Sequence, residues 1–267
     1  MMKELTAVLT GLSMENPLLA ALLVSLYAAL TTTLGGILVV LARKAREGRL
    51  EALLDVGMGF SSGVMIVASF TSLLLPAIDL AGLPTSLAGF TLGALLIHVV
   101  NKLSPHEHLV RGYEGPESLR RKIKAAWLVA IAVIIHNLPE GMAIGASTAY
   151  SIPLGIATGL AIGLQDFPEG LAVSLPVYAS TGSFKLAVAL GALSGLSEVA
   201  TALIAVLAAG GGAVTLALVL AFAAGAMVYV VSHEALPESH RSGHEAHATL
   251  GFFIGFLVML SLDVALS

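Results

Sequence analysis

The chain contains no cysteine and little charge, since only 11% of its 267 residues are Asp, Glu, Lys or Arg. Without thiols it has no disulfide framework, and any metal site must rely on nitrogen and oxygen ligands. A soluble domain of this size carries about 25% charged residues, so the scarcity of charge argues against a soluble globular protein. The net charge of −4 is too small to indicate a partner, and we expect no binding to nucleic acid.

Hydrophobic residues make up 57% of the sequence, and its mean hydropathy is +0.94. A membrane-spanning helix needs about 20 apolar residues, and the sequence divides into stretches of that length. We therefore predict an all-α polytopic membrane protein that forms a single transmembrane domain over residues 1–267. The residues before Pro17 carry no cleavage-like signal, so we expect no signal peptide. The eight predicted spans are about 17–42, 53–78, 84–101, 125–148, 153–178, 186–209, 213–235 and 248–266.

Lysine and arginine are distributed unevenly along this eight-span layout. All of them except Lys3 fall in the loops on one side of the membrane. Because basic loops stay in the cytoplasm, this distribution predicts a protein of the cell (inner) membrane with both termini outside and an even number of spans. The loop at residues 104–124 lies on the predicted cytoplasmic side. It is polar and contains Gly and Pro, so we expect it to have no fold of its own.

Two segments in the middle of predicted spans repeat one polar pattern. They are His136–Gly141 (HNLPEG) and Gln165–Gly170 (QDFPEG). Both reach the same depth on consecutive antiparallel helices, so they can face each other. His136 and Glu140 are four residues apart, which puts both on one helical face, and the second motif has the same spacing. Polar side chains at this depth are costly, so their recurrence indicates a buried functional site.

Each motif also contains a proline followed two residues later by a glycine. Pro139 and Pro168 interrupt the helical hydrogen-bond ladder, free a backbone carbonyl group one turn earlier and are expected to kink their helices. Bent helices of this kind recur at the midplane of transporters. The glycines, Gly141 and Gly170, allow neighbouring backbones to approach closely. A single proline or glycine in a membrane helix is more often a packing feature, so the functional interpretation depends on the doubling.

A third predicted span adds Glu198, so that four acids share one depth: Glu140, Asp166, Glu169 and Glu198. One isolated charge at the centre of a membrane helix costs about 2.5 to 3.5 kcal/mol, and clustered carboxylates also repel one another. No Lys or Arg lies at that depth in any predicted span, so cations or protons must compensate. Two divalent ions would balance four carboxylates, and His136 adds a ligand that zinc and its first-row neighbours favour.

Most of the histidines lie near the predicted cytoplasmic side. Together with nearby acids they suggest a path for an ion from the central site to the cytosol, although histidine-rich loops are often merely solvated. The spacing of these residues does not match a His-Glu-x-x-His metalloprotease motif. The residues of this candidate path are His98, His106, His108, His233, Glu234, Glu238 and His240.

Two residues of the second predicted span are further candidates. Asp79 ends that span near the outer mouth, where it would collect cations, although an exposed Asp at a helix end is common. We include it in the transport path. Met65 lies deeper in the same span and offers a soft sulfur ligand, with packing in the apolar core as the alternative.

These motifs resemble those of the ZIP family of divalent-metal transporters and, within it, the prokaryotic GufA-like branch. The resemblance is carried by His136–Gly141, by Gln165–Gly170 and by Glu198, and the eight-span layout extends it over nearly the whole chain. Many members of that family carry histidine at the positions of Gln165 and Gly170, and this departure bears on metal selectivity.

The resemblance implies a binuclear metal site, transport of metal into the cytoplasm and a common homodimeric state. It also implies that spans 1 to 3 and 6 to 8 form inverted repeats around spans 4 and 5. Glu169 would bridge the two metals, and Glu140 is a second bridging candidate. One metal would be held by His136, Glu140, Gln165 and Glu169, with Met65 as a further ligand, and the other by Asn137, Asp166, Glu169 and Glu198.

The sequence therefore favours a carrier for first-row divalent cations that works by alternating access around the midplane site. Zn²⁺ is the favoured substrate, and Cd²⁺, Fe²⁺ and Mn²⁺ are alternatives. The metal is the substrate rather than a catalytic cofactor, and we expect no catalytic residues. An intramembrane zinc-dependent hydrolase is the second hypothesis, because zinc beside a Glu can activate water. A structural subunit stabilised by tightly held metal is the third.

Overall fold

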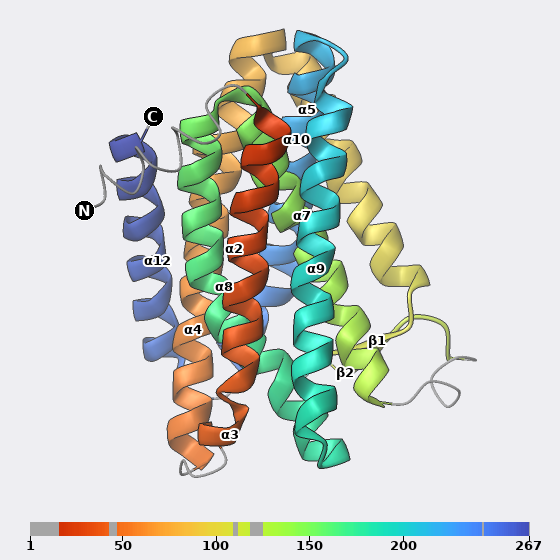
Figure 1. The fold of residues 1–267 in the computed structure, drawn as a ribbon, viewed down its shortest axis with the longest axis vertical. Coiled ribbons are helices and arrows are strands. Elements are labelled where there is room, and N and C mark those ends of the chain that lie inside the picture. Colours follow the sequence, from red (N-terminus) through yellow and green to blue (C-terminus); the bar gives the residue numbers. More distant parts are fainter. Residues whose placement is uncertain (1–15, 43–46, 109–111, 118–124, 242, 267) are drawn as a thin grey trace.

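The computed structural model describes residues 16–42, 47–108, 112–117, 125–241 and 243–266. Nearly all of these residues are helical, and they form one bundle (Figure 1). Two short segments, η1 and η2, are π-helical. The helical elements are α2 (Pro17–Ile37), α3 (Val39–Ala42), α4 (Glu47–Ala68), η1 (Ser69–Leu74), α5 (Leu75–Leu103), α7 (Ala125–Tyr150), α8 (Ile152–Thr181), α9 (Phe184–Ala209), α10 (Ala213–Val230), η2 (Val231–Ala235), α11 (Leu236–Ser239) and α12 (Glu245–Leu266).

Six stretches of the described residues are long and apolar enough to cross a membrane. The prediction of an all-α polytopic membrane protein is confirmed. The stretch Leu50–Leu103 contains a break at Gly82, where φ is 76°, and Figure 1 shows the chain reversing direction there. Helix α8 is not among the six, because its polar motif lowers its apolar character. The six are Pro17–Ile37, Leu50–Leu103, Ala130–Tyr150, Phe184–Ala209, Ala213–Ser239 and Glu245–Leu266.

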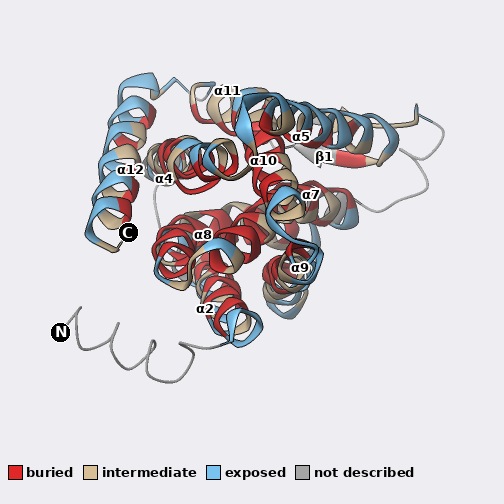
Figure 2. Ribbon diagram, turned by 90° about the horizontal axis from the view of Figure 1, so that it is seen from above, coloured by how far each residue is buried: buried red, intermediate tan, exposed pale blue. Residues whose placement is uncertain are grey.

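The long helices pack in two groups, which lie side by side when the bundle is seen from above (Figure 2). The motif group consists of α2, α7, α8 and α9, and the flanking group consists of α4, α5, α10 and α12. Within the motif group α2 packs mainly on α8 and α7 on α9. Within the flanking group α4 packs mainly on α12 and α5 on α10. The two polar motifs therefore lie on helices of a single group.

Glycines bring the flanking helices into close contact. A Cβ added at Gly59 or Gly63 of α4 would overlap the backbone of α12, and a Cβ at Gly251 or Gly255 of α12 would overlap the backbone of α4. Gly225 of α10 is packed against α5 in the same way. Small residues spaced four apart are typical of close helix packing in membranes, where apolar side chains gain little by leaving lipid.

Part of the loop at residues 104–124 is folded, which contradicts the expectation that it has no fold of its own. Strand β1 (His106–His108) pairs in antiparallel fashion with β2 (Gly112–Glu114), so that His106 lies opposite Glu114. The hairpin is ordered because β1 packs on α7 with the His106 side chain buried, and because Glu114 faces histidines of two elements. We call the end of the bundle that carries this hairpin the hairpin end.

The two π-helical segments occupy equivalent local sequences. Each ends directly before a Leu-Pro pair, Leu75-Pro76 after η1 and Leu236-Pro237 after η2. In both, the leucine N–H reaches the carbonyl group five residues earlier, that of Phe70 or of Val231. A proline in the next turn cannot donate a backbone hydrogen bond, and the wider π turn is a common local adjustment in helices.

Candidate metal centre

The two motifs meet inside the motif group, on neighbouring helices α7 and α8. Ligand atoms of His136, Glu140 and Glu169 all lie within 4.8 Å of one another, and the three side chains are buried. His136 Nε2 is 3.9 Å from Glu169 Oε1. One imidazole and two carboxylates at this separation are a suitable donor set for zinc or a similar first-row ion.

A second group of acids lies beside the first. Ligand atoms of Glu140, Asp166 and Glu198 also lie within 4.8 Å of one another, and all three side chains are buried. Glu198 comes from α9, which approaches closely because a Cβ at Gly141 would overlap the Glu198 backbone. Glu140 belongs to both groups in the structure, whereas the family resemblance gives the bridging role first to Glu169.

The two side-chain amides of the motifs each donate to an acid. Gln165 donates to Glu140 Oε1, and Asn137 Nδ2 donates to Glu198 Oε1 at 2.6 Å. Several other polar atoms of the cluster are buried, and no hydrogen-bond partner meets them within the described residues. They include His136 Nε2, the second oxygens of Glu140 and Glu198, and both oxygens of Asp166. Buried acceptors in this number, with no Lys or Arg among the described residues of the cluster, indicate a site that takes up cations.

Helix α4 contributes to the centre through a residue that the sequence did not indicate. The hydroxyl of Ser61 donates to Glu169 Oε1. Met65 is fully buried, and its sulfur lies 3.9 Å from the Ser61 Oγ. Ser61 thus brings α4 into contact with a motif carboxylate, while Met65 lies one turn further along the same helix face. Serine is common in membrane helices, so nothing in the sequence distinguished Ser61.

A chain of contacts leads from the centre toward the hairpin end. His136 Nδ1 is 3.5 Å from Glu234 Oε2, and Asn101 Nδ2 donates to Glu234 Oε1 at 2.5 Å. Both Glu234 and Asn101 are buried. Glu234 therefore connects the motif histidine to the end of α5. Asn101 was not predicted from the sequence.

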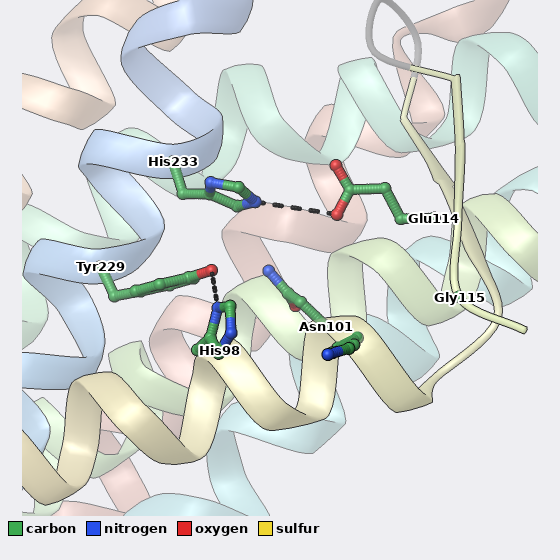
Figure 3. Close-up of a pocket in the computed structure, with 7 residues that line it drawn as sticks. His98, Asn101, Glu114, Gly115, Tyr229 and His233 are labelled. Carbon is green, nitrogen blue, oxygen red and sulfur yellow. Dashed lines mark hydrogen bonds and ion pairs between the residues drawn. The ribbon is translucent and has the colours of Figure 1, made fainter.

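Beyond Asn101 lies a cavity of about 510 Å³ (Figure 3). In it the Tyr229 hydroxyl is 3.0 Å from His98 Nδ1, and Glu114 Oε2 is 3.7 Å from His233 Nε2. The same Glu114 oxygen is 3.8 Å from Nε2 of His106, so this carboxylate lies between two histidines. The cavity is lined by His98, Asn101, Lys102, Glu114, Gly115, Tyr229 and His233.

The remaining path candidates are not brought into this cavity. Glu238 is half-buried on α11, one turn after Glu234. The two ring nitrogens of His240 contact local groups, with Nε2 3.3 Å from the Thr249 hydroxyl on α12. The side chain of His108 lies outside the described part of the structure. Asp79 is exposed near the Gly82 turn, at the end of the bundle opposite the hairpin (Figure 1).

The proline and glycine positions of the motifs lie within helices. Pro139 is inside α7 and Pro168 inside α8, and both helices continue through them. A Cβ at Gly170 would overlap the backbone of α2 at Thr32.

One acid outside the motifs was missed: Asp263 of α12 is buried and accepts from the Ser72 hydroxyl at 3.2 Å. It is the single acid within the last predicted span, which was a usable signal.

The chain is similar to several known proteins. The family model of ZIP zinc transporters matches residues 100–263. Zinc transporter ZIPB of Bordetella bronchiseptica is 41% identical over 90% of this chain and 79% of that protein. Zinc transporter GufA of Myxococcus xanthus is 41% identical over 92% of this chain and 99% of that protein. Zinc transporter ZupT of Corynebacterium glutamicum is 35% identical over 88% of this chain and 94% of that protein.

Proposed function

This chain belongs to the ZIP family of zinc transporters, and from that premise we propose that it carries divalent metal ions, chiefly Zn²⁺, across the membrane. Members of the family are transporters rather than enzymes, and the relatives it matches are named as zinc transporters. Neither the hydrolase hypothesis nor the structural-subunit hypothesis finds support in those names. Cd²⁺, Fe²⁺ and Mn²⁺ are proposed as competing substrates.

The observation that carries the proposal is the buried cluster of four acids around His136. Ligand atoms of the cluster fall into two groups that share Glu140, which supports a binuclear centre. In this arrangement His136, Glu140 and Glu169 hold one ion with Gln165, and Glu140, Asp166 and Glu198 hold the other with Asn137. We include Met65 as an outer ligand on the α4 side. Two divalent ions would neutralise the four carboxylates, which are otherwise costly at this depth.

Ions leave the centre through Glu234 toward the hairpin end, which faces the cytoplasm. The separation of 3.5 Å between His136 Nδ1 and Glu234 Oε2 supports this step, since one imidazole then contacts the centre and the exit. From Glu234 an ion enters the cavity at His98 and His233. The carboxylate of Glu114 also lines this cavity. His106, His108, Glu238 and His240 belong to the outer part of this path, and Asp79 marks the entrance on the other face.

We propose eight spans in one transmembrane domain, with spans 1 to 3 and 6 to 8 as inverted repeats. In the two repeats α2 corresponds to α9, α4 to α10, and the second half of α5 to α12. The central helices α7 and α8 correspond to each other. The main packing pairs are preserved when corresponding helices are exchanged, because α4 on α12 becomes α10 on α5, and α2 on α8 becomes α9 on α7. The π-helical turns η1 and η2 also correspond. Repeats of this kind suit alternating access.

The remaining features of the proposal follow from the family and from the basic loops. The protein lies in the cell membrane with both termini outside, and it forms a homodimer. Alternating access exposes the centre first to the Asp79 side and then to the hairpin end. Amide ligands bind first-row ions more weakly than imidazole does, so Gln165 and Asn137 favour release of the ion, which a carrier requires.

The proposal is tested by ⁶⁵Zn²⁺ uptake into proteoliposomes that contain the wild-type chain or the Glu169→Ala variant. We expect saturable uptake by the wild type and loss of uptake in the variant. The degree to which Cd²⁺, Mn²⁺ and Fe²⁺ inhibit Zn²⁺ uptake by the wild type ranks them as competing substrates. A folded Glu169→Ala protein with wild-type flux would refute the proposed site. Bound metal without flux in the wild type would instead support a structural or hydrolytic role.

A further inference from the structure

The hydroxyl of Ser61, like that of Ser72, donates to an acid on another helix, whereas the hydroxyls of Ser62 and Ser69 do not. Ser62 and Ser69 donate to the carbonyl oxygen four residues earlier, as Ser25 does on α2. This is the usual way for a serine inside a membrane helix to satisfy its hydrogen bond. Ser61 is fully buried and donates instead to the side chain of Glu169, on a different helix and in the other helix group.

Close packing of α4 against the second motif makes this contact possible. Gly57 lies one helical turn before Ser61, and a Cβ there would overlap the ring of Pro168. The absence of a side chain at Gly57 lets α4 approach α8 at Pro168. On the same helix face, one turn later, Ser61 then reaches Glu169. The geometry therefore joins a glycine and a serine of α4 to the Pro-Glu pair of the motif.

The oxygen that Ser61 holds is the one that faces the motif histidine. Glu169 Oε1 accepts from Ser61 and also lies 3.9 Å from His136 Nε2. A carboxylate oxygen has two lone pairs, so Oε1 can keep the Ser61 hydrogen bond while its second lone pair binds an ion. His136 Nε2 is buried and has no hydrogen-bond partner within the described residues. The hydroxyl and the imidazole thus converge on one carboxylate oxygen from opposite helix groups.

We propose that Ser61 is a positioning residue that orients Glu169 toward His136 and thereby sets the affinity of the centre for its ion. This inference rests on the proposed function as a metal carrier. Hydrogen bonds to a ligand from the surrounding shell fix its orientation, and their loss typically lowers metal affinity by about 10- to 100-fold. Because Ser61 belongs to the flanking group and Glu169 to the motif group, separating the groups breaks the hydrogen bond and weakens the site.

The test compares Ser61→Ala, Ser61→Thr and Ser62→Ala with the wild type, all as full-length chains. Zn²⁺ affinity is measured by isothermal titration of the detergent-solubilised protein, and KM and maximal rate are measured by ⁶⁵Zn²⁺ uptake into proteoliposomes. We expect Ser61→Ala to raise Kd and KM by about 10- to 100-fold. Ser61→Thr keeps the hydroxyl and should stay near the wild type. Ser62→Ala, the matched control, removes only a bond within its own helix and should change neither constant.

The outcomes separate this inference from the function on which it rests. Failure of the wild type to bind or transport Zn²⁺ would refute the proposed function. Wild-type transport with an unchanged or lower Kd in folded Ser61→Ala would leave the function standing and overturn the role of Ser61. Loss of affinity in Ser61→Thr as large as in Ser61→Ala would also overturn it, because the hydroxyl would then not be the group that matters.

Discussion

Glu140 is the residue on which the two proposed ion positions depend, because its carboxylate is the one shared by both groups of candidate ligands. Glu198 belongs only to the second group. We expect Glu140→Gln to lose both ions and all measurable uptake, since an amide supplies neither the charge nor the bridging oxygens. Glu198→Gln should bind one ion fewer per chain than the wild type and keep the ion at His136. Metal content of the purified proteins, measured by mass spectrometry after dialysis, checks both expectations.

Equal losses of metal from these two variants would show that the positions are not separate. Equal retention in Glu140→Gln and the wild type would show that the shared carboxylate is not a ligand. Both variants replace an acid by its amide, so differences in side-chain volume do not enter the comparison.

The sequence indicated most of the residues that are costly to bury, with Asp263 as an exception, and missed two that are inexpensive. Glu140, Glu169 and Glu198 were found because an unpaired acid in a membrane helix demands a compensating partner. Ser61 and Asn101 gave no such signal, since a hydroxyl or an amide can be satisfied within its own helix or by a neighbour. Their roles appear only when distant helices are placed together.

At the scale of elements, close packing between α4 and α12 depends on glycines. A Cβ at Gly255 would overlap the backbone oxygen of Phe60, and backbone cannot move aside as a flexible side chain can. We expect Gly255→Ala to destabilise the folded protein by about 1 to 3 kcal/mol, the usual cost of overpacking. Thermal unfolding in detergent should show a lower midpoint. Gly210→Ala is the control, because the nearest atom to its added Cβ lies at 3.3 Å and the residue is exposed.

A midpoint for Gly255→Ala equal to that of Gly210→Ala would contradict this packing account.

The helices themselves were largely predictable, since long apolar stretches reveal membrane helices by composition alone. Two features were not. The hairpin of β1 and β2 depends on the partners of His106 and Glu114, and the π turns lie directly before Leu-Pro pairs.

At the scale of the whole molecule, the centre lies in one helix group, and two polar contacts join it to the other group. Ser61 donates to Glu169 on one side, and Glu234 lies beside His136 on the other. The sequence placed both motifs at one depth because their spans are antiparallel, and it indicated an inner face from the basic loops. It did not indicate how the helices divide into two groups, because that depends on which glycines face which backbones.

Because the centre lies within the motif group, bound metal should stabilise the packing of that group rather than one helix. The candidate ligands of the second group come from α7, α8 and α9, so an ion held there would join three helices and remove the repulsion among their acids. A ligand that binds only the folded state at 100 times its Kd adds about 2.7 kcal/mol of stability. We expect Zn²⁺ to raise the thermal midpoint of the detergent-solubilised wild type and a chelator to reverse the rise. The shift should vanish in Glu140→Gln, which lacks the shared ligand. A shift of equal size in that variant would place the stabilising metal elsewhere, for example at the histidines of the hairpin end.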